Sequence, residues 1–487
     1  MLVNIFFIAS ECVPFSKTGG LADVVGALPR VLASRGHQVS VFLPRYRHTD
    51  IGRLLVPNLS LSFGHLSHVV DIGEGKTLGG VRHFFVDYPP YFDRDGLYVD
   101  AGADYPDNPE RFALFCRAAL EFMRHIGRPD VLHCHDWQAA QVPILLKSVL
   151  AGDPLFQKLP VVFTVHNLGY QGIYAADAMQ RIGLPPHLYS INGLEFYGLL
   201  NLLKGGLVFS DFVTTVSPRY AQEIQTPEFG HGLDGVVRSR ARTVVGILNG
   251  VDYDEWNPET DRFLAARYSA SDLSGKQKCK RELLERFRLP ADSRRRPLVG
   301  IVSRFATQKG FDLIVEQADA LMAENISLVA LGTGEPAFEE ALRELAHRFP
   351  QRFAVRVAYD NALAHKIEGG SDIFLMPSRY EPCGLNQIYS LRYGTVPVVR
   401  ATGGLDDTIE SFDPRTGQGT GFKFEEYSGA AMLACLRRAL DLYHHDPAAW
   451  QQVMRNGMAR DFSWNASAAE YESLYARVVK QTQSGYN

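Results

Sequence analysis

The sequence lacks the features that place a protein in a membrane or on a nucleic acid. No apolar run approaches the ~20 residues that cross a bilayer, and the first ten residues lack the basic start of a signal peptide. There is no long basic block, and 50 Lys and Arg against 54 Asp and Glu give a net charge of −4. We therefore expect a cytoplasmic protein that binds neither membranes nor nucleic acids.

Cysteine pairs are also missing, and the first strand-end loop lacks the common nucleotide-binding fingerprints. The six cysteines are scattered without a CxxC pair, so no zinc site or disulfide framework is predicted and a reducing compartment is favoured. Cys134 lies between His133 and His135, but successive residues of a strand face opposite sides, so no metal cluster is expected there. The glycine loop after the first predicted strand, 17–20, matches neither the G-x-G-x-x-G spacing nor a Walker loop, which disfavours a nicotinamide oxidoreductase.

What is present is a chain of 487 residues, 46% hydrophobic and 21% charged, typical of a soluble protein of about two or three domains. Short apolar runs alternate with helical spacing in two series, which predicts an α/β protein with two doubly wound sheets. A polar span, 254–296, separates the two series and places a domain boundary near residue 248. The predicted strands are 1–10, 37–43, 131–133, 161–165, 212–216 and 244–247, then 298–302, 327–331, 353–357, 373–376 and 396–399. Extra short strands or hairpins are also expected between residues 59 and 87.

Two further segments have simple interpretations. The basic runs 276–281 and 294–296 are most simply solvated helix or linker faces, with contact to an anionic ligand as the alternative. From Trp464 to Val478 the chain keeps one apolar helical face, so this segment is predicted to pack against a domain.

The segment 377–384, Pro-Ser-Arg-Tyr-Glu-Pro-Cys-Gly, follows one of the predicted strands and precedes a helix. This pattern puts Glu381 at the carboxyl end of a strand, where open α/β sheets bind ligands. A solvated glutamate in a surface turn is the alternative, which the neighbouring motifs make less attractive.

Several other strand-end loops offer groups that bind anions. Lys17-Thr18-Gly19-Gly20 precedes a helical pattern, so its amides and ammonium suit a phosphate, although a tight turn with a surface lysine fits the pattern equally well. Arg304 and Lys309 share one loop, and paired cations at a strand end suggest a diphosphate. The segment 401–404, Ala-Thr-Gly-Gly, repeats the glycine pattern, and His166 ends a buried strand.

Taken together and in order, these motifs resemble those of bacterial glycogen synthases and plant starch synthases. The resemblance spans residues 5 to about 464 and is most specific at Lys-Thr-Gly-Gly and Glu-Pro-Cys-Gly-Leu. It is carried by 17–24, 135–137, 164–167, 249–252, 303–304, 308–310 and 377–384.

The resemblance implies a glycosyltransferase B fold, with two Rossmann-like domains facing a central cleft. The N-terminal domain would be 1–248, joined by the C-terminal helix 461–487, and the C-terminal domain would be 249–460. It also implies transfer of glucose from a nucleotide-diphosphate-glucose, expected to be ADP-glucose, to the non-reducing end of an α-1,4-glucan with retention. No metal or other cofactor is expected.

The resemblance also assigns roles to residues. Glu381, Arg304, Lys309 and His166 would be catalytic: the two cations would hold the diphosphate, and Glu381 and His166 would bind glucosyl hydroxyls. Asp136 and Asn249 would lie near the sugar, Tyr359 would stack on the base, and Cys383 would line the pocket without acting as a nucleophile. The other expected substrate-binding residues are Lys17, Gly19, Gly20, Asp23, Gly384, Thr402, Gly403 and Gly404.

Rival functions fit the sequence less well. A retaining transferase that makes sucrose or a lipid-linked sugar would not account for the contexts of Lys17 and Glu381. The chain is short for a phosphorylase and shows no pyridoxal-type lysine context. A glucan-binding protein with an inactive transferase fold is the remaining class, and the intact Arg304, Lys309, His166 and Glu381 count against it.

Overall fold

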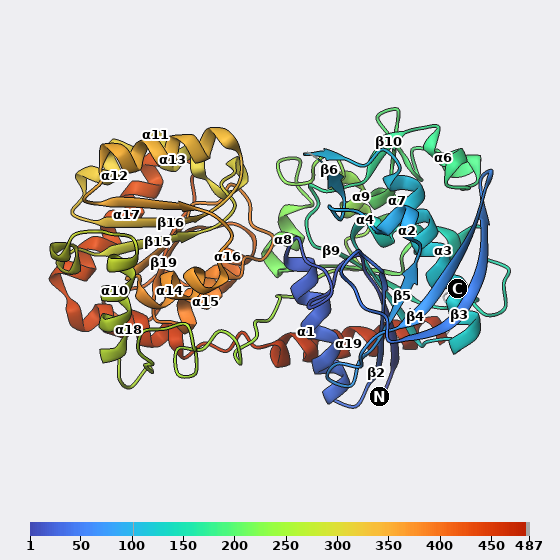
Figure 1. Cartoon of the computed structure of the whole chain (residues 1–487), viewed down its shortest axis with the longest axis horizontal. Helices are drawn as coiled ribbons and strands as arrows, with labels where there is room; N and C mark the ends of the chain where they lie inside the picture. Colours follow the sequence, from blue (N-terminus) through green and yellow to red (C-terminus); the bar gives the residue numbers. More distant parts are fainter. Residues whose placement is uncertain (101, 484–487) are drawn as a thin grey trace. The chain divides into compact units, whose positions relative to one another are not determined.

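The computed structural model describes residues 1–100 and 102–483, and the chain divides into two compact units. The first unit contains residues 1–216 and 221–250 and the chain from Trp464 onward. The second unit contains residues 217–220 and 251–463. Residues 484–487, which fall in the predicted C-terminal helical segment, lie outside the described residues. Figure 1 shows the elements of both units, coloured along the sequence.

The first unit is built on a sheet in which seven parallel strands are extended by an antiparallel hairpin. Within the described residues its order is β14-β13-β9-β8-β1-β2-β5-β4-β3. The parallel strands are β1 (Asn4–Ile8), β2 (Gln38–Pro44), β5 (Arg82–Asp87), β8 (Val131–His135), β9 (Val161–Val165), β13 (Phe212–Thr215) and β14 (Val244–Gly246); the hairpin is β3 (Arg53–Phe63) and β4 (Leu66–Glu74). Small sheets contain β10 (Ile173–Ala175), β12 (Leu199–Asn201) and β11 (Glu195–Phe196), and β6 (Val99–Asp100) and β7 (Ala103–Asp104).

The second unit carries a parallel sheet of order β17-β16-β15-β18-β19-β20. In chain order this is 3-2-1-4-5-6, the doubly wound arrangement. The order of the strands changes direction between β15 and β18, although the strands themselves are parallel. The predicted starts of its first five strands are confirmed, whereas the short final strand was not predicted. The strands are β15 (Leu298–Val302), β16 (Ser327–Gly332), β17 (Phe353–Val357), β18 (Ile373–Met376), β19 (Val396–Arg400) and β20 (Phe422–Phe424).

Helices connect these strands in both units. The chain up to residue 250 contains α1 (Gly20–Ser34), α2 (Pro89–Phe92), α3 (Asn108–Ile126), α4 (Asp136–Ala139), α5 (Gln141–Lys147), α6 (Ala178–Arg181), η1 (Pro186–Leu188), α7 (Leu202–Phe209), α8 (Pro218–Glu223) and α9 (Asp234–Ser239). The remainder contains α10 (Ser274–Arg286), η2 (Ala291–Arg295), η3 (Thr307–Lys309), α11 (Phe311–Glu316), α12 (Ala318–Ala323), α13 (Pro336–Arg348), α14 (Asn361–Gly370), α15 (Asn386–Arg392), α16 (Gly403–Thr408), α17 (Gly429–His445), α18 (Pro447–Met458) and α19 (Trp464–Gln483).

The last helix, α19, belongs to the core of the first unit. Its predicted apolar face is buried, with Tyr471, Tyr475 and Val478 fully inaccessible to solvent. These side chains join a cluster with residues of β1, β2 and α1, and α19 runs beside α1 (Figure 1). Burial of large side chains contributes about 1.5–3 kcal/mol each, so α19 is an integral part of this unit.

The prediction of a solvated basic face over 276–281 is wrong for two of its lysines. Lys276 and Lys280 on α10 are 3% and 2% exposed. The Lys280 ammonium lies 2.6 Å from Asp372, and Lys276 donates to the Thr395 hydroxyl at 2.7 Å and to two backbone carbonyls. A buried ammonium requires such partners, and the partners lie about a hundred residues further along the chain, beyond the reach of local pattern analysis.

Candidate active site

The sheet topology of each unit brings the predicted site residues to one edge. In each sheet, successive strands are added first on one side of the starting strand and then on the other. This change of strand order falls between β1 and β8 in the first unit and between β15 and β18 in the second. Ligands of doubly wound sheets bind where the loops from two such neighbouring strands diverge. The loops that follow these four strands carry Lys17, Asp136, Lys309 and Glu381.

In the second unit, Lys309 and Glu381 form a close ion pair. The Lys309 Nζ lies 2.8 Å from Oε1 and 2.6 Å from Oε2 of Glu381. Glu381 is only 5% exposed, and Ser378 Oγ donates a further hydrogen bond to its Oε2 at 3.1 Å. The predicted phosphate-binding cation therefore neutralises the predicted sugar-binding carboxylate in this structure.

Tight backbone packing holds these two loops together. Gly310 adopts a φ of +78°, in the left-handed region that favours glycine. A Cβ at this position would overlap the backbone carbonyl of Pro377. The Arg379 backbone N–H also donates to the Gln308 carbonyl at 2.9 Å. The β15 and β18 loops are thus locked against each other at the point where Lys309 meets Glu381.

Arg304 lies in the same loop as Lys309 but faces solvent. Its side chain is exposed, and its Nη2 donates to the Gln308 Oε1 at 2.9 Å. A neutral amide is a weak partner for a guanidinium compared with a phosphate. Arg304 therefore keeps its charge available for an anion, whereas Lys309 is already engaged.

The glycines that begin α16 pack against the Glu381 loop. The Gly404 N–H donates to the carbonyls of Glu381 and Pro382, at 3.1 and 3.3 Å. A Cβ on Gly403 would overlap the Glu381 carbonyl oxygen, and one on Gly404 would overlap that of Cys383. These glycines are needed for close backbone approach, and binding of phosphate by their amides stays a prediction.

The remaining predicted residues of the second unit differ in exposure. Cys383 and Thr402 are buried, at 5% and 0% exposed, and Gly384 forms a left-handed turn with φ +70°. Tyr359, which follows β17, is 83% exposed. An exposed tyrosine ring has a free face for stacking, as the prediction for a nucleobase requires.

In the first unit, a buried carboxylate that the sequence analysis missed organises the Lys17 loop. Glu11 is 3% exposed and accepts hydrogen bonds from the Thr18 N–H, from the Thr18 hydroxyl at 2.6 Å and from the Gly19 N–H at 3.3 Å. The Tyr98 hydroxyl donates to the same carboxylate at 2.6 Å. The Gly19 amide predicted for phosphate is therefore bonded to Glu11, and its phosphate role, like that of Gly20, stays a prediction.

Lys17 itself is exposed and pairs with Asp23 on α1, with 2.7 Å between Nζ and Oδ1. This contact ties Lys17 to α1, and the expected role of Asp23 in substrate binding stays a prediction. An exposed ion pair of this kind is worth about 0–1 kcal/mol, so a stronger anion would displace it at little cost.

Asp136 and His166 come together at the ends of β8 and β9. The Asp136 Oδ1 accepts the His166 N–H at 2.8 Å, and Asp136 has a positive φ of 55°. Burial raises the pKa of Asp136 to about 7; the His166 N–H opposes this rise and the charge of Glu11 adds to it. Burial also lowers the pKa of His166 to about 3, so its imidazole is neutral at physiological pH.

Asn249, which follows β14, presents an unsatisfied polar atom. The side chain is 6% exposed, and its Oδ1 has no hydrogen-bond partner in the described part of the chain. Buried polar atoms without partners are rare, and a bound ligand is one way to satisfy them. The observation fits the prediction that Asn249 lies near the sugar, which stays untested.

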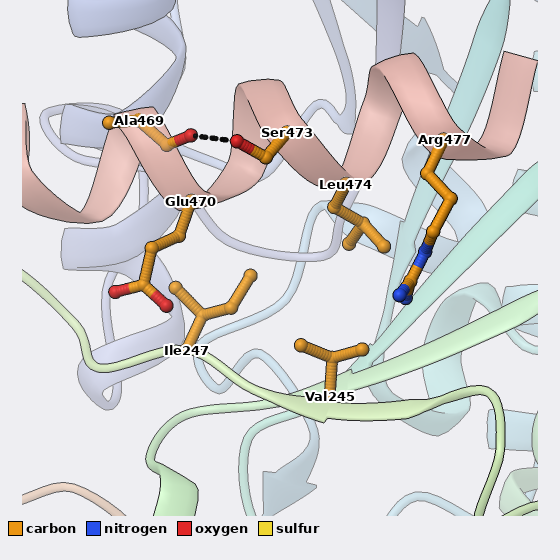
Figure 2. A pocket seen from close by; sticks show the side chains of 7 residues that line it. All are labelled: Val245, Ile247, Ala469, Glu470, Ser473, Leu474 and Arg477. Carbon is orange, nitrogen blue, oxygen red and sulfur yellow. Dashed lines mark hydrogen bonds between the residues drawn. The ribbon is translucent and has the colours of Figure 1, made fainter.

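A cavity elsewhere in the first unit contains none of the predicted residues. It has a volume of about 500 Å³ and lies between β14 and α19. Figure 2 shows Val245, Ile247 and Leu474 on its apolar side, with Glu470 and Arg477 at its borders.

Within the described residues, no helix has the length and hydropathy needed to span a bilayer.

Two family models match the chain, one in each half. The starch synthase catalytic domain matches residues 4–239, and glycosyl transferases group 1 matches residues 285–455. A glycogen synthase from Koribacter versatilis is 58% identical over 478 residues, covering 98% of both chains. A glycogen synthase from Anaeromyxobacter sp. is 51% identical over 485 residues, covering 98% of this chain and 100% of the relative.

A solved structure extends this similarity to the arrangement of the backbone. The catalytic domain of starch synthase IV from Arabidopsis thaliana, bound to ADP and acarbose, matches with a TM-score of 0.90 at 35% sequence identity. The match covers 99% of this chain and 100% of the plant domain.

Proposed function

Because the chain belongs to the glycogen and starch synthase family, we propose that it transfers glucose from ADP-glucose to the non-reducing end of an α-1,4-glucan, with retention of configuration. Its two Rossmann-like domains are those of the glycosyltransferase B fold. The observation that carries the proposal is the Lys309–Glu381 pair beside Arg304 at the reversal point of the second sheet. This site combines cations for a diphosphate with a buried carboxylate for sugar hydroxyls.

The two cations would stabilise the leaving group. As the bond from glucose to the diphosphate breaks, negative charge builds on the departing phosphate, and fixed positive charges lower the energy of that state. Arg304 has a guanidinium fork that suits two phosphate oxygens. Lys309 would turn from Glu381 towards the phosphate or bridge the two, so its interaction would strengthen during departure.

Glu381 would bind glucosyl hydroxyls and favour the positive character that develops near the anomeric carbon. Same-face displacement retains configuration when the departing phosphate deprotonates the acceptor hydroxyl, so no protein nucleophile is needed. This scheme differs from that of the retaining glycosidases, in which a carboxylate forms a covalent intermediate. Glu381 is held by Lys309 and Ser378, which orients it for binding.

Residues of the first unit would act on the same nucleotide sugar. His166 would contact a glucosyl hydroxyl, Asp136 would hold the His166 backbone, and the unsatisfied Oδ1 of Asn249 would accept a hydrogen bond from the substrate. Lys17 would leave its exposed pair with Asp23 to approach the phosphates.

The other assigned residues would complete the nucleotide and sugar pocket. The exposed ring of Tyr359 would stack on the base. The packed backbone at Cys383, Gly384, Thr402, Gly403 and Gly404 would form the pocket wall near the diphosphate. We also propose that the protein works in the cytoplasm, because its six cysteines are buried thiols and not disulfides, as a reducing compartment keeps them.

A radiometric assay with glycogen tests the proposal. Purified protein should incorporate label from ADP-glucose faster than from UDP-glucose at matched concentrations, and the Glu381→Ala variant prepared in parallel should show that the activity belongs to this chain. Equal or faster incorporation from UDP-glucose would reject the donor assignment. Absence of incorporation from both donors would reject the glucosyltransferase.

A further inference from the structure

A second histidine lies directly behind His166. The His135 Nδ1 is 3.0 Å from the His166 Nε2, and the two rings meet edge to edge, with 5.3 Å between their centroids and 29° between their planes. His135 ends β8 and His166 follows β9, and these strands are neighbours in the sheet. The contact is therefore set by the central strands of the fold and not by a mobile loop.

The other nitrogen of His135 has no partner. His135 is fully buried, and its Nε2 makes no hydrogen bond to any residue that the structure describes. The ring of Phe7 lies almost parallel to that of His135, with 15° between the ring planes and 5.5 Å between the centroids. The edge of the imidazole that carries Nε2 therefore does not point into the face of the Phe7 ring. The ring of His133 also lies beside that of His135, with 4.3 Å between the ring centroids and 31° between the ring planes.

Two placements of the proton between these neutral rings are possible, and they differ in cost. If His135 carried its proton on Nε2, a buried N–H donor would have no acceptor, and such orphaned donors are rare in proteins. If His135 carries its proton on Nδ1, that proton is shared with His166 and the Nε2 lone pair alone is unsatisfied. Burial lowers the pKa of both imidazoles, which keeps a second proton off the pair.

We propose that His135 is a positioning residue that donates its Nδ1–H to the His166 Nε2 and thereby fixes the proton of His166 on Nδ1. His166 Nδ1 has no hydrogen-bond partner among the described residues, so this nitrogen is available to a ligand. The consequence for the reaction rests on the proposed function: His166 presents an N–H donor to a glucosyl oxygen and does not act as an acceptor there. The Asp136 carboxylate fixes the backbone of the same residue at 2.8 Å.

His133 provides a matched control within the same strand. It is also fully buried, but both of its nitrogens have partners, with the Tyr475 hydroxyl at 2.8 Å and the Thr164 hydroxyl at 2.6 Å. Its hydrogen bonds lead to α19 and to the sheet, away from His166. A change at His133 should disturb packing without removing the proton donor to His166.

The experiment reads the tautomer directly in the unliganded full-length protein. Imidazole-¹⁵N-labelled histidine and long-range ¹H–¹⁵N correlation spectra distinguish a protonated ring nitrogen from an unprotonated one, and His166→Gln identifies the His166 signals. We expect a protonated Nδ1 and an unprotonated Nε2 at His166. A protonated Nε2, or a mixture of both tautomers, in the wild-type protein would overturn the proposal whatever the enzymatic activity is.

Variants then separate positioning from packing. His135→Phe keeps an aromatic ring but has no donor, so His166 should become a mixture of tautomers and kcat/KM should fall about tenfold, the value of one hydrogen bond. His133→Asn should leave the His166 tautomer unchanged. A pure Nδ1–H tautomer in His135→Phe, or an equal disturbance in His133→Asn, would refute the specific role of His135. Because the spectra need no substrate, a failure of the glucosyltransferase assignment would be seen separately.

Discussion

The Lys309 ammonium contacts both carboxylate oxygens of Glu381, and the two residues are 72 positions apart in the sequence. Their side chains are 19% and 6% exposed, so each neutralises the other in a largely dry environment. Removing one member of a buried ion pair leaves an uncompensated charge, which costs about 3–5 kcal/mol. Substitution of either residue therefore has a structural effect in addition to its effect on the reaction.

A double-mutant cycle separates these two effects. Lys309→Ala should lower kcat by ~10²-fold or more, because the contact that strengthens as the leaving group gains charge is lost. It should also lower Tm, whereas the Lys309→Ala/Glu381→Gln double variant should regain most of that stability because no charge is left unpaired. A single variant with near-normal kcat and only a raised KM would mean that Lys309 contributes uniform binding.

Charge and placement at Glu381 are tested by two conservative substitutions. Glu381→Gln keeps the size and loses the charge, and Glu381→Asp keeps the charge but retracts it by one methylene. If the charge dominates, Gln is the more damaging change; if placement dominates, Asp costs as much or more, ~10²-fold in kcat. Wild-type rates in both variants would remove Glu381 from the site, and a covalent glycosyl adduct on it would replace same-face displacement with a nucleophilic mechanism.

Glu11 should act through the Lys17 loop. Glu11→Ala leaves the backbone N–H groups of Thr18 and Gly19 and the Tyr98 hydroxyl without their acceptor, so KM for ADP-glucose should rise about tenfold, the equivalent of one charged hydrogen bond. Glu11→Gln should be milder, because its oxygen can still face the backbone donors.

The matched comparison for this prediction is Lys17→Ala. If Glu11 only positions Lys17, the two changes should not add in the double variant. Fully additive losses in KM would show that Glu11 acts independently of the loop.

Asp136 should give the protein a distinct pH dependence of stability. Burial raises its pKa to about 7, so between about pH 4 and pH 7 the folded state holds a proton that the unfolded state has released. The contribution of the protonated Asp136 side chain to the free energy of unfolding is present at low pH and is lost as the pH rises through 7. Asp136→Asn should therefore gain stability relative to wild type over this range, by at most about 4 kcal/mol.

The difference between the two unfolding curves is the quantity to measure. The buried His133 and His166, whose pKa values are lowered to about 3, act in the opposite direction in wild type, since they lose stability as the pH falls. They cancel in the comparison because both proteins contain them. A free-energy difference that does not change between pH 4 and pH 8 would contradict a raised pKa at Asp136.

Local sequence patterns were sufficient for most strands of the two sheets and for the motif positions, but not for the short strand β20 or for most side-chain contacts. The strands that precede Glu381 and Arg304 were predicted because short, near-continuous apolar runs are typical of buried parallel strands. The alternation of strand and helix also predicted the doubly wound sheets. By contrast, nothing near Lys309 in the sequence indicates that its ammonium pairs with Glu381.

Each residue that the sequence analysis missed has at least one partner distant in the chain, Tyr98 for Glu11 and His166 for His135. Glu11 resembles any polar residue after a strand until Tyr98 and Thr18 are seen to bond to it. His135 has significance only because β8 and β9 are adjacent in the sheet. In the sequence, His135 is marked only by its place as the first residue of the His-Asp-Trp motif, 135–137.

The most direct test of the account is the fate of the transferred glucose. Glycogen elongated with ADP-[¹⁴C]glucose should release its label as maltose when treated with β-amylase, which removes maltose only from the non-reducing ends of α-1,4-linked chains. That result would establish the acceptor end, the linkage and the retained α configuration together. Label that resists β-amylase, or that accumulates as free glucose, would contradict the proposed transfer.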